Sequence, residues 1–223
     1  MVDIRYIGHS AFEIKLKDNS IMIDPLVSIN QAYDYKKIEN LTDIFLTHGH
    51  GDHLGEALEI AKDKNATITA IFELAKYCES QGCKTRDVGM GGWINYDWGR
   101  VVFLPAFHSS SLPDGGYAGH AASILIDVEG VRIYHAGDTC LNSEMKLVKE
   151  LYRPNIALLP IGGTYTMDVE HAAIAAQWIG AQTVIPMHYG TFPSIQADIQ
   201  KFAQLIQMQN TNFCILNPNE IKQ

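Results

Sequence analysis

Residues 48–53 read His-Gly-His-Gly-Asp-His, and no other stretch constrains the chain as strongly. Imidazole nitrogens and carboxylate oxygens are side-chain atoms that bind zinc and similar divalent metals. In an extended backbone, His48 and His50 point the same way, so both can reach one ion. Asp52 and His53 are adjacent and diverge, which suits a second ion beside the first. The intervening glycines leave room for the ions and for a tight turn, so the stretch predicts a metal site.

Further ligand-type residues come at or just beyond the ends of apolar runs that are typical of strands. The motif itself begins where the apolar run 43–47 ends. The residues that follow other such runs are His108, Asp138 and His188. Strands supply rigid positions and the loops beyond them supply ligands, so several such endings at one edge of a sheet can build one site. Alone, each of these histidines would more often be structural, but together with the motif they are candidate ligands.

The remaining pattern predicts a mixed α/β fold. Short strand-like runs dominate the first third and the middle of the chain, and helical patterns alternate with strands toward the C-terminus. Helices are predicted over 54–64 and 195–208, for example. Strands in the middle with helices toward both flanks favour two packed sheets, each covered by helices on its outside. With 223 residues, of which 47% are hydrophobic, the chain can bury a sizeable core, and we expect a single domain over 1–223.

Composition argues against several classes of partner. The chain has 17 Lys plus Arg against 25 Asp plus Glu, a formal net charge of −8, so we expect no nucleic-acid partner, which would need clustered basic residues. No apolar run approaches the roughly 18 residues of a membrane helix, and the first residues lack a signal-peptide core. The four cysteines are not closely spaced, which is typical of reduced thiols. We therefore expect a cytoplasmic protein with no membrane partner.

Seven stretches, in order along nearly the whole chain, carry a resemblance to one family. They are Gly8-His9-Ser10, Ile23-Asp24-Pro25, 47–55, 105–110, 135–139, 159–162 and 185–189. In these stretches the chain resembles the metallo-β-lactamase superfamily. It is most similar to the branch of bacterial and archaeal metal-dependent hydrolases related to the ascorbate-phosphate lactonases. The resemblance implies the four-layer αββα sandwich of that superfamily.

The resemblance also implies two divalent metal ions as cofactors. The ligands it implies are His48, His50 and His108 for the first ion, Asp52, His53 and His188 for the second, and Asp138 as the bridge. Zinc is favoured by its affinity for imidazole, and manganese stays open because two ligands are carboxylates. A histidine at position 50, where redox di-iron relatives carry glutamate, favours hydrolysis. The related lactonases form oligomers, so a homo-oligomer stays open here, although no stripe in the sequence marks an interface.

A mechanism follows from two such ions. They share a bridging hydroxide at neutral pH, because metal binding lowers the pKa of water toward about 7. Asp52 accepts a hydrogen bond from this nucleophile, and His9 is a candidate catalytic acid or oxyanion contact, with a packed structural role as its alternative. Asp24 and His135 are candidates for orienting the ligands. The alternative role for Asp24 is that of a simple turn cap. Candidates for lining the substrate pocket are Ser109, Gly162, Tyr189 and Thr191.

The sequence therefore predicts a two-metal hydrolase that acts on a small, anionic ester, lactone or phosphodiester. One alternative is a metal-dependent binding or sensor protein that keeps the ions without turnover. A ribonuclease of the same superfamily is a second alternative, which the net charge of −8 disfavours. Pocket shape depends on loop conformation, so the pattern does not select one substrate.

Overall fold

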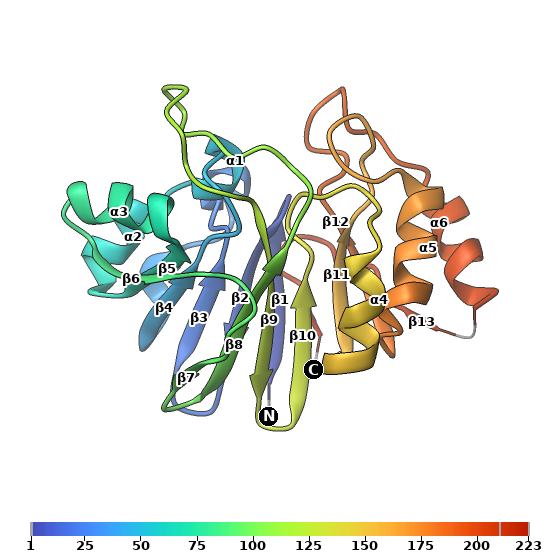
Figure 1. Ribbon diagram of the computed structural model, residues 1–223, viewed down its shortest axis with the longest axis horizontal. Helices are drawn as coiled ribbons and strands as arrows, with labels where there is room; N and C mark the ends of the chain where they lie inside the picture. Colours follow the sequence, from blue (N-terminus) through green and yellow to red (C-terminus); the bar gives the residue numbers. More distant parts are fainter. Residues whose placement is uncertain (1, 210, 223) are drawn as a thin grey trace. The chain divides into compact units, whose positions relative to one another are not determined.

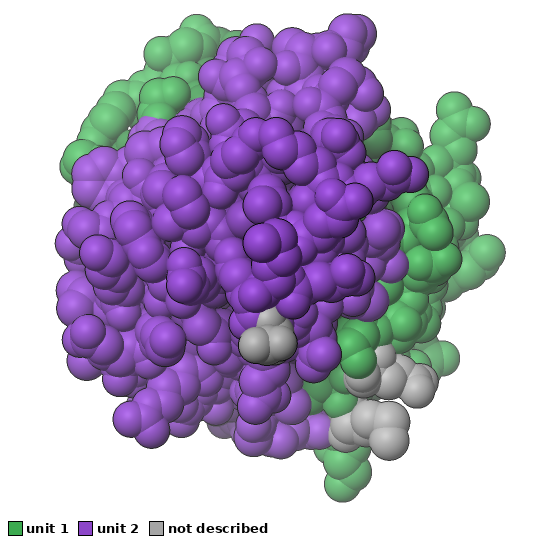
Figure 2. All heavy atoms as spheres, turned by 90° about the vertical axis from the view of Figure 1, so that its right-hand side faces the viewer, with its two compact units in different colours: residues 1–92, 109–121, 216–223 green, residues 93–108, 122–215 purple. Residues whose placement is uncertain are grey.

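The computed structural model describes residues 2–209 and 211–222. Its residue contacts divide the chain into two compact units, which we describe separately. Unit 1 comprises residues 1–92, 109–121 and 216–223, and unit 2 comprises residues 93–108 and 122–215 (Figure 2). The single domain expected from the sequence stays a prediction. Within the described ranges, no helix has both the length and the apolar character needed to cross a membrane.

Unit 1 is built on a seven-stranded mixed sheet with the order β14-β1-β2-β3-β4-β5-β6 (Figure 1). The strands from β14 to β3 are antiparallel, and those from β3 to β6 are parallel. The strands are β1 (Asp3–Gly8), β2 (Ala11–Lys15), β3 (Ser20–Ile23), β4 (Leu41–Phe45), β5 (Thr67–Ile71), β6 (Lys84–Val88) and β14 (Ile221–Lys222). The helical segments are η1 (Val27–Ile29), η2 (Tyr35–Lys37), α1 (Gly51–Leu54), α2 (Ala57–Lys64) and α3 (Phe72–Ser80).

One face of this sheet forms a core with α2 and α3. Met22, Ile44 and Ile68 occupy adjacent positions in a row across β3, β4 and β5. They are fully buried in one cluster with Ile60 of α2 and Leu74 of α3. Removing a side chain of this size from water stabilises the fold by about 1.5–3 kcal/mol. The core therefore fixes the parallel strands whose ends lead into the loops described below.

Gly55 separates α1 from α2, so the helix predicted over 54–64 begins later than expected. Gly55 has φ 46° and ψ −131°, a conformation that side chains disfavour. A Cβ at this position would lie 2.5 Å from the carbonyl oxygen of Pro25. The chain from the motif therefore turns sharply at Gly55, and α2 starts at Ala57.

Unit 2 is also built on a seven-stranded mixed sheet, with the order β13-β12-β11-β10-β9-β8-β7. The strands from β7 to β10 are antiparallel, and those from β10 to β13 are parallel. The strands are β7 (Ile94–Tyr96), β8 (Gly99–Pro105), β9 (Ala122–Val128), β10 (Val131–His135), β11 (Ile156–Pro160), β12 (Thr183–Met187) and β13 (Asn212–Phe213). The helices are α4 (Glu144–Leu147), the π-helical η3 (Val148–Tyr152), α5 (Val169–Ile179) and α6 (Ile199–Gln207).

The expected fold class is confirmed, since the chain is a mixed α/β protein with two sheets and flanking helices. The main differences lie at element ends. The helix predicted over 195–208 begins only at Ile199, because the Asp198 carboxylate accepts a hydrogen bond from the Lys201 backbone N–H at 2.9 Å and caps the helix. Strand β6 is not expected from its sequence, which is mostly polar and largely exposed at the sheet edge.

In each unit, several strands run in the same direction and end at one edge of their sheet. In unit 1 these are β1, β3 and β4, and in unit 2 they are β8, β10, β11 and β12. Most of the candidate site residues lie in the segments that follow these strand ends, so each unit presents its own group of ligand-type side chains.

Candidate metal centre

The motif in unit 1 runs from the end of β4 into α1. His48 is buried, and its Nε2 lies 3.0 Å from Nδ1 of His50. The ring of His48 also lies beside that of His53, with centroids 4.1 Å apart. Ring nitrogens this close, on side chains fixed by a short turn, are placed as two donors to one cation would be.

A buried carboxylate holds the histidines of this turn. Asp24 follows β3 and is completely buried. Its Oδ2 accepts a hydrogen bond from His53 Nδ1 at 2.7 Å and from the Thr47 hydroxyl at 2.6 Å. The backbone N–H of Thr47 donates to the other carboxylate oxygen at 2.8 Å. A carboxylate at Nδ1 fixes the tautomer of an imidazole and leaves Nε2 for a metal. This is the orienting role that the sequence suggests for Asp24.

Thr47 extends this arrangement to His48. Because its hydroxyl donates to Asp24, its oxygen can accept from Nδ1 of His48, which lies 3.0 Å away. His48 then offers Nε2, the nitrogen that faces His50. One carboxylate and one hydroxyl therefore set the orientation of two candidate ligands.

Asp52 and His9 form a second contact in unit 1. His9 directly follows β1, and its Nε2 lies 3.0 Å from Oδ2 of Asp52. The His9 side chain is fully buried, whereas 31% of the Asp52 side chain is exposed. One ligand-type atom from each of His9, Asp52 and His53 lies within 4.8 Å of the other two. His9 thus lies where it can hold the Asp52 carboxylate, and its expected role as a proton donor stays a prediction.

The segment 109–121 packs against the motif within unit 1. Ser110 Oγ accepts from the Gly49 backbone N–H and donates to the Ala118 carbonyl, both at 3.2 Å. A Cβ on Gly49 would lie 2.5 Å from the Cβ of Ala118, so only glycine allows this approach. Ser109 Oγ lies 3.5 Å from Nε2 of His50. The predicted pocket residue Ser109 is therefore next to a candidate ligand.

Unit 2 contributes three candidate ligands from three separate strand ends. His108 comes after β8, Asp138 after β10 and His188 after β12. Nε2 of His108 and Nε2 of His188 lie 3.5 Å and 3.0 Å from the same oxygen, Oδ2 of Asp138. Asp138 is 3% exposed and His188 is 2% exposed. A buried carboxylate oxygen that faces two imidazoles suits a ligand that bridges two cations.

Backbone contacts hold these ends in place. Thr139 Oγ1 accepts from the Phe107 backbone N–H at 3.1 Å, which connects the loops that carry His108 and Asp138. His135, the last residue of β10, is fully buried, and its Nδ1 accepts from the Gly137 backbone N–H at 3.1 Å. His135 therefore contacts the turn before Asp138, where the sequence suggests a supporting role.

The other pocket candidates, all in unit 2, lie in the loops after β11 and β12. Gly162 follows β11 and packs directly against the backbone carbonyl of His188. Tyr189 and Thr191 follow His188 along the chain. Burial raises the pKa of the Tyr189 hydroxyl above its ordinary value, so Tyr189 remains a hydrogen-bond donor at neutral pH.

Three site residues have left-handed backbone conformations, and each directly follows a strand. They are His9 (φ 55°), Asp24 (φ 45°) and His188 (φ 53°). This conformation costs a non-glycine residue roughly 1–2 kcal/mol and is concentrated at functional sites in proteins. Both units therefore accept backbone strain where a polar side chain leaves the end of a strand.

The donor atoms fit divalent metals in each unit taken alone. Unit 1 supplies histidine nitrogens and a carboxylate within a few ångströms of one another, and carboxylate and hydroxyl partners orient two of the rings. Unit 2 supplies two imidazoles around one carboxylate oxygen. Nitrogen and oxygen donors of this kind suit zinc and manganese.

Comparison with known proteins identifies the family. The model of the β-lactamase superfamily domain matches residues 3–188. The chain belongs to the β-lactamase superfamily. A "UPF0173 metal-dependent hydrolase" of Geobacillus thermodenitrificans is 46% identical over 208 residues, which cover 91% of this chain and 92% of that protein. A protein of the same description from Bacillus cereus is 44% identical over 210 residues, with 92% of each chain covered.

A solved structure of the superfamily is also similar. Igni18, described as a novel metallo hydrolase from the archaeon Ignicoccus hospitalis, has 35% sequence identity and a TM-score of 0.91. The match covers 99% of this chain and 97% of Igni18. The resemblance to the metallo-β-lactamase superfamily is thus confirmed, and the closer relation to the ascorbate-phosphate lactonases stays a prediction.

Three residues that support the site were not expected from the sequence: Thr47, Ser110 and Thr139. Thr47 directly precedes the motif, and this position could have marked it as a supporting residue. Ser110 and Thr139 are small hydroxyl residues in loops, and their contacts are made to backbone groups distant in sequence. Nothing in the local pattern marks such contacts.

Proposed function

We propose that this protein is a metal-dependent hydrolase that uses two divalent ions. The observation that carries the proposal is the turn 48–53, where buried, oriented imidazoles and a carboxylate converge. The curated relatives of nearly full length are described as metal-dependent hydrolases, which supports the same activity here. Zinc is the favoured ion by imidazole affinity, with manganese as the alternative.

The proposed ligand set combines the candidate residues of both units. His48 and His50 of unit 1 would hold one ion together with His108 of unit 2. Asp52 and His53 would hold the other together with His188. Asp138 would bridge the two ions, and its contacts with both His108 and His188 support this role.

The residues of the chain would divide the chemistry as follows. Bound divalent ions supply Lewis acidity and lower the pKa of a water molecule toward neutrality. Asp52, partly exposed beside the buried His9, would accept a hydrogen bond from the attacking water and orient it. His9 would keep the Asp52 carboxylate in position. Asp24 and Thr47 would hold the ligand imidazoles in the tautomers that expose Nε2.

The proposed substrate is a small anionic ester, lactone or phosphodiester. Cations attract an anionic substrate and stabilise negative charge that develops on its carbonyl or phosphoryl oxygens. Ser109, Gly162, Tyr189 and Thr191 are the proposed lining residues, and the protonated hydroxyl of Tyr189 would serve as a donor to a substrate oxygen. We further propose that the protein works in the cytoplasm, with no nucleic-acid or membrane partner.

Metal analysis combined with a substrate panel tests this proposal. The purified chain should carry close to two zinc or manganese ions and hydrolyse activated lactones, esters or phosphodiesters. His48→Ala should lose metal and abolish turnover. His171→Ala is the matched control, because the His171 side chain is 58% exposed on α5, and it should behave as the unmodified protein.

The possible outcomes separate the candidate functions. Full turnover in His48→Ala would falsify the proposal. Two bound ions without activity on any ester, thioester, lactone or phosphodiester would favour a binding or sensor protein. Cleavage of RNA at physiological salt would favour a ribonuclease.

A further inference from the structure

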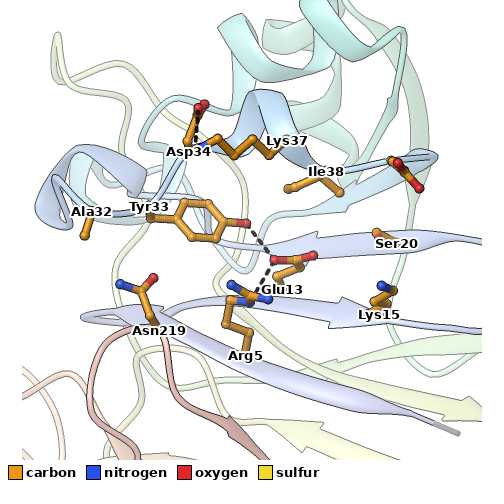
Figure 3. Close-up of a pocket in the computed structure, with 11 residues that line it drawn as sticks. Arg5, Glu13, Lys15, Ser20, Ala32, Tyr33, Asp34, Lys37, Ile38 and Asn219 are labelled. Atoms are coloured by element: carbon orange, nitrogen blue, oxygen red, sulfur yellow. Dashed lines mark hydrogen bonds and ion pairs between the residues drawn. The ribbon is translucent and has the colours of Figure 1, made fainter.

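Unit 1 contains a pocket of about 610 Å³ that the proposed hydrolysis does not use. It lies over β1, β2 and the start of β3, with residues 32–34 and 37–39 as a wall (Figure 3). Ser20 begins β3 and Lys15 ends β2. These positions belong to the edge of the sheet opposite the ends of β1, β3 and β4, which carry the candidate ligands of unit 1. The pocket is therefore separate from the turn 48–53 within this unit.

The register of the sheet explains why this pocket is polar. Arg5, Glu13 and Met22 are neighbours in one cross-strand row on β1, β2 and β3. The same row continues through the apolar residues that α2 and α3 cover. Helices α2 and α3 pack mainly on β4, β5 and β6. Toward β1 and β2 the row changes from apolar to charged residues. The pocket floor is thus the uncovered end of a face that is otherwise core.

Glu13 and Tyr33 give the pocket a fixed wall. Glu13 is only 7% exposed, and its Oε2 accepts from the Tyr33 hydroxyl at 3.0 Å. Arg5 Nε lies 3.3 Å from the same oxygen. Burial and the nearby Glu13 carboxylate raise the pKa of Tyr33, so its hydroxyl remains a donor. Figure 3 shows Tyr33 reaching from the 32–39 segment toward Glu13. A buried carboxylate needs partners of this kind, because an unpaired buried charge would destabilise the fold.

The donors that remain open are concentrated on the floor. Arg5 pairs with Glu13 through Nε, and its terminal nitrogens have no hydrogen-bond partner in residues 2–209 and 211–222. Over the same ranges, Lys15 forms no ion pair and the Ser20 hydroxyl forms no hydrogen bond, although Ser20 is only 3% exposed. A guanidinium, an ammonium and a hydroxyl around one space are typical of a site for a carboxylate or phosphate group.

The acidic residues of the pocket are placed differently. Glu13 is already paired on the floor. Asp34 accepts from the Lys36 backbone N–H at 3.1 Å and lies 3.7 Å from Lys37 Nζ. Glu39 is exposed at the rim. Negative charge is therefore either compensated or peripheral, while Arg5 and Lys15 line the pocket with donors that no described residue occupies.

We propose that this pocket binds a small metabolite through an oxyanion group, either carboxylate or phosphate, with Arg5, Lys15 and Ser20 as its donors. The volume is in the range of small-molecule sites, which are about 300–1,000 Å³, so the ligand is larger than a single inorganic ion. The chain carries a net charge of −8, and an anion would be drawn to this pocket by its local donors rather than by the overall field.

Titration calorimetry on the full chain, treated with chelator to remove metal, tests the proposal. The probes are inorganic phosphate and citrate, with glucose as an uncharged comparison. We expect phosphate or citrate to bind with a dissociation constant of at most about 10 mM. Glucose should not bind. Preference for phosphate would indicate a phosphorylated ligand, and preference for citrate would indicate a carboxylate ligand.

Variants distinguish a built site from general attraction. Lys15→Glu should weaken binding at least about tenfold, since it replaces a cationic donor by a carboxylate that repels an anionic ligand. Ser20→Ala should weaken binding by a smaller factor. Lys36→Glu is the matched control, with the same charge change on an exposed lysine outside the pocket lining. His48→Ala should leave binding unchanged. Absence of binding by the unmodified chain, or equal weakening by Lys36→Glu, would overturn the proposal.

Discussion

The two units share a strand plan but deliver their candidate ligands in different ways. Each has a seven-stranded sheet that is antiparallel in one half and parallel in the other. Unit 1 places four ligand-type residues on six consecutive positions of one turn. Unit 2 places three on the ends of three strands that are far apart in sequence. The same architecture thus supports a local and a dispersed way of grouping candidate ligands.

The difference has consequences for how each group is held in place. In unit 1, a carboxylate and a hydroxyl contact the candidate ligand rings directly, through Asp24 and Thr47. In unit 2, the candidate ligands His108 and His188 both contact Asp138, and Thr139 contacts the backbone beside them. We expect unit 1 to depend on side chains around its ligands and unit 2 to depend on Asp138 itself.

The largest expected effect is that of Asp138→Asn. The amide removes the charge that faces both His108 and His188, and a lost bridging ligand affects both proposed ions. Several kcal/mol of transition-state stabilisation correspond to about a 1,000-fold loss in kcat/KM. Kinetics and metal analysis measure the effect. Asp97→Asn, an exposed carboxylate of the same unit, should retain activity and metal, and comparable losses in both variants would contradict a special role for Asp138.

The difference between the units also explains what the sequence could predict. His48 to His53 were identifiable because their spacing is local and a turn keeps it. His108, Asp138 and His188 were marked only by strand-like runs before them, and the resemblance was needed to join them. The left-handed backbone at His9, Asp24 and His188 had no signal, because it depends on how each strand end meets its neighbours.

The fold shows the same difference between features set by the local sequence pattern and features set by contacts between distant segments. Apolar periodicity predicted the two sheets and the flanking helices, since core burial follows directly from sequence pattern. Strand β6, with three exposed residues among five, was missed because pairing with β5 and not burial places it in the sheet. The position of α2 depended on the approach of Gly55 to Pro25, which is a contact between distant segments.

Asp24→Asn should give the next largest effect and tests the direct support in unit 1. The substitution replaces a buried acceptor of three hydrogen bonds with an amide that cannot serve all three donors. Loss of such a partner lowers metal affinity by about 10–100-fold. Metal competition titration measures it, and turnover at saturating metal should fall much less than affinity. Asp18→Asn, in an exposed turn, is the control, and an unchanged affinity in Asp24→Asn would remove the proposed orienting role.

Gly49→Ala tests whether packing fixes the turn of unit 1. A Cβ would lie 2.5 Å from Ala118 Cβ and 3.1 Å from the Ser111 carbonyl, and overpacking of this kind costs about 1–3 kcal/mol. Gly51 is the matched position, because its nearest neighbour would be Pro113 Cγ at 3.8 Å. Urea unfolding of metal-free protein should show a lower stability for Gly49→Ala and a change within about 0.5 kcal/mol for Gly51→Ala. Equal stabilities of the two variants would show that segment 109–121 accommodates the added methyl group without a loss of unfolding free energy.

Thr139→Val and Thr47→Val form the finest comparison between the units. Thr139 accepts from the Phe107 backbone N–H, donates to the Cys140 carbonyl at 2.9 Å and contacts no described ligand ring. Losing an acceptor for a half-buried N–H costs about 1 kcal/mol of unfolding free energy. Because the effect acts on the loops and not on an imidazole, metal affinity should change only a few-fold. Thr47→Val breaks contacts with both Asp24 and His48, so its metal affinity should fall further at a similar loss of stability. If Thr139→Val reduces metal affinity more than Thr47→Val does, the ligands of unit 2 are the more finely supported group, and the contrast between direct and indirect support is reversed.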